Sequence, residues 1–253
     1  MKILINSHIF RDGINKILTV IDKKNSRPIL TNCLINAKDN KIEIIATDLE
    51  VTSKVIINAI VENEGKFCIN TKNLSDILRE LPDHNLELNI DHSQNVLNLN
   101  CKKIKYSLLI TNADDYPQVT FENSSKPLKI KSKDLIEIIN KTSHAISTDE
   151  TRVNLNGIYI QQLENKLRAV AIDGHRLALL DVNNFESTNP VLNDGVIIPK
   201  KGILEIKKLA EGYADSEFTI FLDESFIYIS LEDECYLSVR LIAREYPKYQ
   251  TVI

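Results

Sequence analysis

Apolar residues along the chain repeat with two different periods. Strict alternation of apolar and polar residues, as over 42–46, 86–90, 97–101, 218–222 and 226–230, predicts half-buried strands separated by short polar turns. Helical spacing over 8–24, 72–81, 132–142 and 200–209 predicts four amphipathic helices, with stripes formed by Phe10, Ile14, Ile17 and Ile21, by Leu74, Ile77, Leu78 and Leu81, by Leu135, Ile138 and Ile139, and by Ile203, Ile206 and Leu209. Helices packed on antiparallel sheets define an α+β fold.

The chain also repeats itself. Arg27–Leu30, Asn40-Lys41 and Ala46–Asp48 return 125 positions later as Arg152–Leu155, Asn165-Lys166 and Ala171–Asp173. Tyr106 and Tyr116-Pro117 return 130 positions later as Tyr236 and Tyr246-Pro247. The second copy therefore contains five additional residues.

Two copies of about 125 residues predict two domains, since this is an ordinary domain size. The polar segment that ends at Pro127 places the domains at 1–123 and 127–253. Within each copy, a strand, a helix and three strands are followed by the same series again. Each domain is therefore expected to be a doubled unit.

Charge is divided unevenly between the predicted elements, although the net charge of the 253-residue chain is only −4. The four helical windows hold 12 Lys/Arg and 7 Asp/Glu, an excess of +5, and the rest of the chain carries −9. Basic helices and acidic sheets suit a protein whose helices face duplex DNA. Ordinary solvated lysines would explain the same modest excess.

No targeting or membrane segment is predicted. Polar residues interrupt the apolar start of the chain within ten positions, and every later apolar run is too short for a membrane span. The four cysteines are widely spaced in apolar segments, which is typical of free thiols in a reducing compartment. We therefore expect a cytoplasmic protein.

Candidate chemistry is sparse. Asp173 and His175 in the string Asp173–Ala178 could form an acid–base pair, but no nucleophile or metal ligand stands at a suitable spacing. A turn at the end of a strand, with Gly174 in an unusual backbone conformation, explains the string better. No metal-ligand pattern and no nucleotide-binding loop is present, so we expect no cofactor, no metal and no catalysis.

Several of these strings together resemble one family, the bacterial beta sliding clamp, or DNA polymerase III beta subunit. They cover the whole chain in the family's order and spacing: Arg27–Leu30, Thr47–Glu50, Asp173–Ala178, Pro199–Gly202 and Tyr246-Pro247. The resemblance implies clamp domains with two helices inward and sheets outward, three per subunit, in a homodimeric ring around DNA. It implies the first two domains here, with the third clamp domain absent.

The resemblance also implies site residues. Partner peptides of the polymerase, clamp loader and repair proteins would enter a pocket lined by Leu155, Ile172, Gly174, His175, Arg176, Leu177, Pro247 and Val252. Duplex DNA would be held without regard to its sequence by Lys24, Lys72, Arg79, Arg152, Lys200 and Lys201. The ring would close at Tyr106 and Leu108. Asp149, Val153 and Asn154 replace the family's DNA-contacting groups in one loop.

Three expectations follow for function. The first is a non-catalytic processivity factor that tethers partners on DNA, present here as a fragment that is monomeric by itself. The second is a native two-domain clamp that closes as a trimer, as eukaryotic and archaeal processivity factors do. The third is a small-molecule hydrolase that uses Asp173 and His175.

Overall fold

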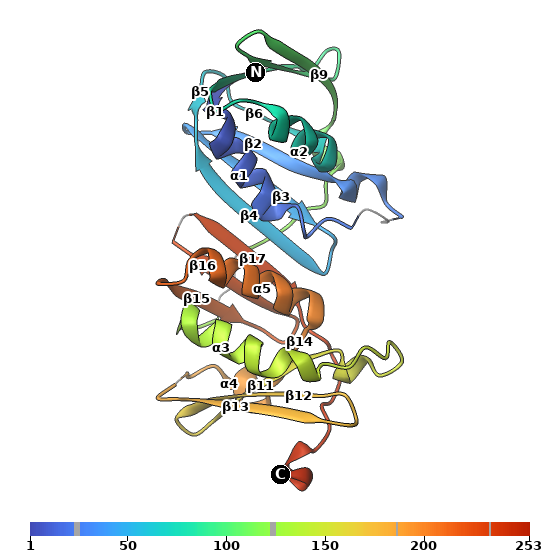
Figure 1. The fold of residues 1–253 in the computed structure, drawn as a ribbon, viewed down its shortest axis with the longest axis vertical. Helices are drawn as coiled ribbons and strands as arrows, with labels where there is room; N and C mark the ends of the chain where they lie inside the picture. The colour runs from blue at the N-terminus through green and yellow to red at the C-terminus, as the bar shows by residue number, and fades with distance from the viewer. Residues whose placement is uncertain (23–25, 122–124, 186, 233) are drawn as a thin grey trace. The chain divides into compact units, whose positions relative to one another are not determined.

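The computed structural model describes residues 1–253 except 23–25, 122–124, 186 and 233. The side chain of Val252 is also not described. Contacts group Met1–Thr120 and Asp233–Tyr236 into one compact unit and Phe121–Glu232 and Leu237–Ile253 into a second. Each unit is an α+β structure with antiparallel sheets, which confirms the predicted class (Figure 1).

The first unit follows the predicted order of strand, helix and three strands, twice over. Its elements are β1 (Lys2–Asn6), α1 (Ser7–Ile17), β2 (Asn32–Lys38), β3 (Lys41–Thr47), β4 (Val51–Asn58), β5 (Ile60–Val61), β6 (Gly65–Asn70), α2 (Thr71–Glu80), β7 (Asn85–Asp91), β8 (Val96–Cys101) and β9 (Ile104–Thr111).

The second unit repeats this order with one added helix, α4. Its elements are β10 (Leu128–Lys131), α3 (Ser132–Thr142), β11 (Gly157–Leu163), β12 (Lys166–Ile172), β13 (Leu177–Asn183), α4 (Pro190–Asp194), β14 (Val196–Pro199), α5 (Lys200–Gly212), β15 (Glu217–Leu222), β16 (Phe226–Leu231), β17 (Cys235–Arg240) and the 3-10 helix Tyr249–Val252. Helices α2 and α5 begin 129 positions apart, so four of the five additional residues lie before α5, in the part of the chain that contains α4.

The two halves of each unit exchange their first strands. Strand β1 pairs with β7 and β6 pairs with β2, so each first strand joins the sheet of the other half. In the second unit β10 pairs with β15 and β14 pairs with β11 in the same way. A unit therefore folds as a whole, because neither half keeps its own sheet complete.

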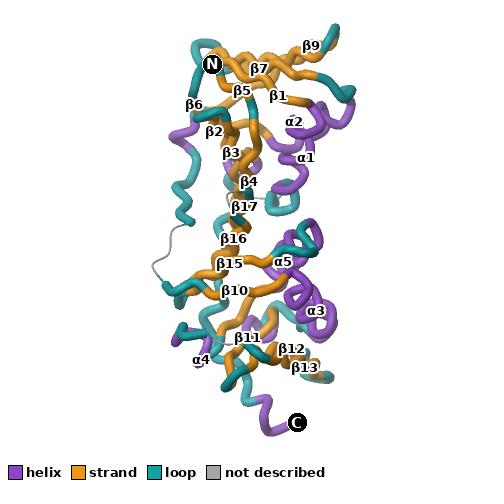
Figure 2. Tube along the Cα trace, turned by 90° about the vertical axis from the view of Figure 1, so that its left-hand side faces the viewer, coloured by secondary structure: helices purple, strands orange, loops and turns teal. Residues whose placement is uncertain are grey.

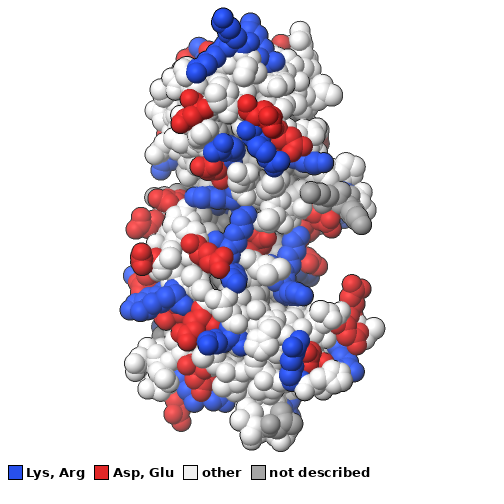
Figure 3. Space-filling model, in the orientation of Figure 1, with Lys and Arg blue, Asp and Glu red and all other residues white. Residues whose placement is uncertain are grey.

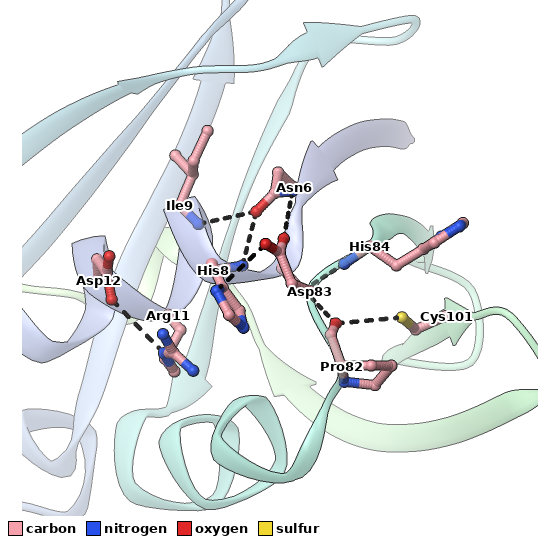
Figure 4. Close-up of polar contacts among 10 residues, drawn as sticks. Asn6, His8, Ile9, Arg11, Asp12, Pro82, Asp83, His84 and Cys101 are labelled. Atoms are coloured by element: carbon pink, nitrogen blue, oxygen red, sulfur yellow. Dashed lines mark hydrogen bonds and ion pairs between the residues drawn. The ribbon is translucent and has the colours of Figure 1, made fainter.

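A serine at the start of one helix in each unit fastens the two halves together. The amide of Ser7 donates to the carbonyl of His84 (3.0 Å) and its hydroxyl donates to the carbonyl of Pro82 (2.6 Å). Beside it, the Asn6 side chain caps α1 and donates to Asp83 (2.8 Å) (Figure 4). In the second unit the amide and hydroxyl of Ser132 both donate to the carbonyl of Ser216, each at 2.9 Å.

The long helices, α1 and α2 in the first unit and α3 and α5 in the second, lie on one side of the strands, whereas the short α4 lies on the other side (Figure 2). Phe10, Ile14 and Ile17 of α1 are fully buried, as the helical spacing predicts. The expectation that this helix runs on to residue 24 is wrong. The helix ends at Ile17, and after the turn that follows Val20 is buried while Ile21 lies outside the helix and is only partly buried.

Candidate functional site

A tight turn between β12 and β13 is organised by one carboxylate. Asp173 Oδ1 accepts hydrogen bonds from the amides of His175 (2.9 Å) and Arg176 (3.0 Å), and its Oδ2 accepts from Arg176 Nε (2.8 Å). These donors lower the pKa of Asp173 to about 2, the backbone amides contributing most. Gly174 has a φ of +96°, as the sequence predicts.

This geometry gives Asp173 a structural task and does not favour the hydrolase. Its carboxylate bonds to the backbone of His175 and not to the imidazole ring, so the two side chains do not form an oriented acid–base pair. Among the described residues, no group of three or more His, Cys, Asp and Glu side chains is placed to hold a metal ion.

Arg152 lies over the same turn. A Cβ atom on Gly174 would stand 2.7 Å from Nη1 of Arg152, so the absence of a side chain at Gly174 makes room for the guanidinium. Nε of Arg152 lies 3.4 Å from Asp149 Oδ2. The sequence suggested Arg152 only as a phosphate contact, but the structure also places it beside the predicted peptide pocket.

Next to this turn the structure brings together much of the predicted pocket. Leu155 belongs to a buried apolar cluster, and the partly buried Ile172 and Leu177 pack against it. Gly174, His175, Arg176 and Pro247 are exposed, whereas Leu155 is only 7% exposed. Leu155 therefore lies beneath the surface and packs in the cluster that supports Ile172 and Leu177. The side chain of Val252 lies outside what the structure describes.

The segment after β17 carries Pro247 and is held by three aromatic rings, which we call the tyrosine cluster: Tyr159, Tyr246 and Tyr249. The rings of Tyr159 and Tyr246 stack with centroids 4.7 Å apart and planes 8° apart. Tyr249 meets Tyr159 at 6.1 Å and Tyr246 at 6.5 Å, and is only 2% exposed. Beside the segment is an open groove of about 600 Å³, lined in part by Tyr159, Gly195 and Pro247.

The loop before Leu155 is tied to this segment. Asn154 Nδ2 donates to the carbonyl of Glu245 (3.3 Å), and Asp149 accepts from the amide and hydroxyl of Thr151. Two of the residues that replace the family's DNA-contacting groups therefore have defined structural partners, while Val153 is 46% exposed.

The other predicted DNA contacts lie on helices. Lys72, Arg79 and Lys200 are exposed on α2 and α5, Lys201 is partly buried, and Lys24 lies outside the described residues. The observed spans of α1, α2, α3 and α5 hold ten basic and seven acidic residues, a smaller excess than the predicted windows gave. Acidic side chains lie among the basic ones on the face that Figure 3 shows. Helix α5 alone, with four lysines and two glutamates, has a clear positive excess.

Strand β9 bears the predicted ring-contact residues. Its ladder with β8 covers Ile104–Leu109, whereas β6 pairs only with Ile110 and Thr111. Tyr106 is 40% exposed, Leu109 is 79% exposed and Leu108 is partly buried. Among the described residues, β9 therefore has one edge without a partner strand along most of its length, and apolar side chains are exposed on this strand.

The four cysteines are free and buried, as predicted. Burial raises the pKa of Cys33 to about 12 and that of Cys68 to about 12, so both stay as unreactive thiols. No helix in the described part of the chain is long and apolar enough to cross a membrane.

Tandem doubled units with exchanged first strands and with paired helices on one face define a class, the DNA sliding clamps. The comparisons agree. Residues 1–120 match the family model of the DNA polymerase III beta subunit, N-terminal domain, and residues 129–248 match that of its central domain. The chain belongs to this family.

Named relatives and solved structures extend the match over the full chain. The beta sliding clamp of Caulobacter vibrioides is 31% identical and that of Rickettsia felis 29%; the chain covers 68% and 66% of their lengths. The DnaN sliding clamp of Bartonella birtlesii, solved bound to griselimycin, superposes with a TM-score of 0.93 at 31% identity and is covered to 68%. The Caulobacter crescentus pol III beta structure gives 0.93 at 29% identity, with 69% covered.

Proposed function

We propose that this chain supplies two domains of a ring that encircles duplex DNA and tethers a replicative polymerase and other partners, without catalysing a reaction itself. The match to both family models over nearly the whole chain carries this proposal. Lysine-rich α5 supports sequence-independent phosphate contact. The domain limits proposed are 1–123 and 127–253, and the free buried thiols favour the cytoplasm.

We propose further that partners dock through short peptides at the surface formed by Ile172, Gly174, Arg176, Leu177 and Pro247. Partly buried aliphatic side chains offer anchorage to apolar residues of a peptide, and the exposed guanidinium of Arg176 can orient a polar group. Binding of this kind holds a partner at high effective concentration on DNA.

Peptide binding by the 253-residue chain tests this site. The probe is a fluorescent synthetic peptide with leucine and phenylalanine anchors and one acidic residue. We expect fluorescence anisotropy to show binding that Leu177→Ser weakens at least tenfold. The control is Leu109→Ser, which removes a more exposed leucine on β9. Equal affinity of the Leu177 variant and the unsubstituted chain would reject the site.

A further inference from the structure

We propose that the tyrosine cluster, Tyr159, Tyr246 and Tyr249, positions the peptide site: it fixes the segment that carries Pro247, while Gly195, which has no side chain, leaves room for the Tyr159 ring. This inference rests on the peptide-binding function proposed above. It assigns a role to three residues and to the added α4 region that the predicted pocket does not include.

The segment after β17 has few other attachments. Its backbone bonds to the rest of the described unit through the amides of Leu241, to Ser225 (2.8 Å), and Ile242, to Ile197 (3.0 Å). Beyond Ile242, the backbone hydrogen bonds of the described residues are local, such as that from the Tyr249 amide to the Pro247 carbonyl (2.7 Å), and the Asn154 side chain donates to the carbonyl of Glu245. Further attachments are the packing of the tyrosine rings and the Tyr246 hydroxyl, which lies 3.4 Å from the carbonyl of Val170, so the tyrosine cluster largely determines where Pro247 lies.

The first unit has a corresponding cluster with only one tyrosine. Comparing the two clusters shows which of the tyrosines the fold itself requires. Tyr116 there corresponds to Tyr246 and is likewise buried, with its hydroxyl near the carbonyl of Ile45, just as the hydroxyl of Tyr246 lies 3.4 Å from that of Val170. At the positions of Tyr159 and Tyr249, however, the first unit has Leu34 and Val119. The fold therefore accepts aliphatic residues at both positions.

The two additional tyrosines occur in the unit that carries the proposed peptide site. Aromatic rings restrict one another's orientation more than aliphatic side chains do, because stacked and edge-on contacts have preferred geometries. Replacing leucine and valine by two tyrosines thus suits a segment that must keep one position while its outer side binds a partner.

The residues added before α5 also contact the tyrosine cluster. The Tyr159 hydroxyl donates to the carbonyl of Asp194 at the end of α4 (2.9 Å). Gly195 follows with a φ of +82°, and a Cβ atom there would collide with the Tyr159 ring and hydroxyl. Glycine at 195 is thus required for Tyr159 to lie where it stacks on Tyr246.

The test gives the second cluster the composition of the first, in the variant Tyr159→Leu/Tyr249→Val. Because the first unit folds with these residues, we expect a folded protein whose affinity for the labelled peptide is at least tenfold weaker. Tyr249→Phe should keep the affinity within about twofold, since the ring packing remains. Tyr213→Leu is the matched control: it removes a tyrosine that packs edge-on against Phe218 in the same unit, and its affinity should stay within about twofold.

The possible results separate the two proposals. Thermal unfolding of each variant shows whether the loss of affinity is larger than the loss of stability explains. The Tyr213→Leu variant shows how much affinity is lost when a tyrosine elsewhere in the same unit is removed. Unchanged affinity in the double variant, together with loss in Leu177→Ser, would overturn the positioning role and leave the peptide site standing. If the unsubstituted chain binds no peptide, both proposals fail.

Discussion

Asp173 shows how one side chain can define the conformation of a turn. Its carboxylate satisfies two amides and one guanidinium, and these donors favour the ionised form. The folded-state pKa, about 2, is below the ordinary value of 3.8. Its contribution to the turn is therefore complete above pH 4 and is lost as the pH falls through about 2.

We expect the amide resonances of His175 and Arg176 to shift together with a midpoint near pH 2. Substitution Asp173→Asn should remove this transition and weaken peptide binding several-fold, because the asparagine side chain has only one oxygen and its NH2 group cannot accept the bond that Oδ2 accepts from Arg176. An NMR pH titration measures the midpoint. A midpoint near 4 would show that the donors do not hold the carboxylate in solution.

Gly202 matters because it has no side chain. It stands where α5 packs on β17, and a Cβ atom there would collide with the side chain of Val239. We expect Gly202→Ala to cost about 1–3 kcal/mol of unfolding free energy through overpacking. Val239→Ala in the same chain should recover part of this loss, and urea unfolding of the single and double variants measures the coupling. Fully additive losses would contradict the proposed collision.

At the residue scale, the sequence alone could identify Gly174 because glycine follows a strand-ending aspartate. It could not place Arg152 on that glycine, because the contact joins a loop to a turn more than twenty residues away. The role of Gly195 was equally hidden, since it lies between α4 and β14 and its close neighbour Tyr159 lies on β11, far from it in the sequence. A search for tyrosines added in the second copy would have pointed to the tyrosine cluster.

Among the helices, α5 carries most of the positive excess and should dominate DNA binding. Each phosphate contact that is lost reduces the slope of log K against log salt by about 0.9. We expect Lys200→Ala/Lys201→Ala to reduce this slope by about two on linear duplex. Lys102→Ala/Lys103→Ala, on the β8–β9 hairpin, changes the charge equally and should leave the slope unchanged. Equal effects of the two pairs would assign binding to net charge alone.

Most elements could be predicted because each has a buried face with a regular period. The end of α1 could not, since Ile21 continues the helical spacing although the chain turns after Ile17 and buries Val20 instead. Helix α4 was missed because five residues are too few to show a period. The exchange of first strands also escaped prediction, because strand pairing depends on contacts distant in sequence.

For the whole molecule, the state of association distinguishes the remaining alternatives. We expect the 253-residue polypeptide to be monomeric at 28.8 kDa, because the family resemblance pairs the β9 edge with a different domain. Multi-angle light scattering at increasing concentration measures this. A stable trimer would instead support a clamp that closes from three two-domain chains.

The exchange of first strands has a consequence for how small a working piece of this protein can be. A polypeptide limited to one half of a unit, such as residues 1–58, would leave β1 without its partner β7 and β2 without its partner β6. Two identical halves, however, could each donate a first strand to the other. A protein that consists of one half alone should therefore fold only as an intertwined dimer. Duplication and fusion of its gene would then give the doubled unit.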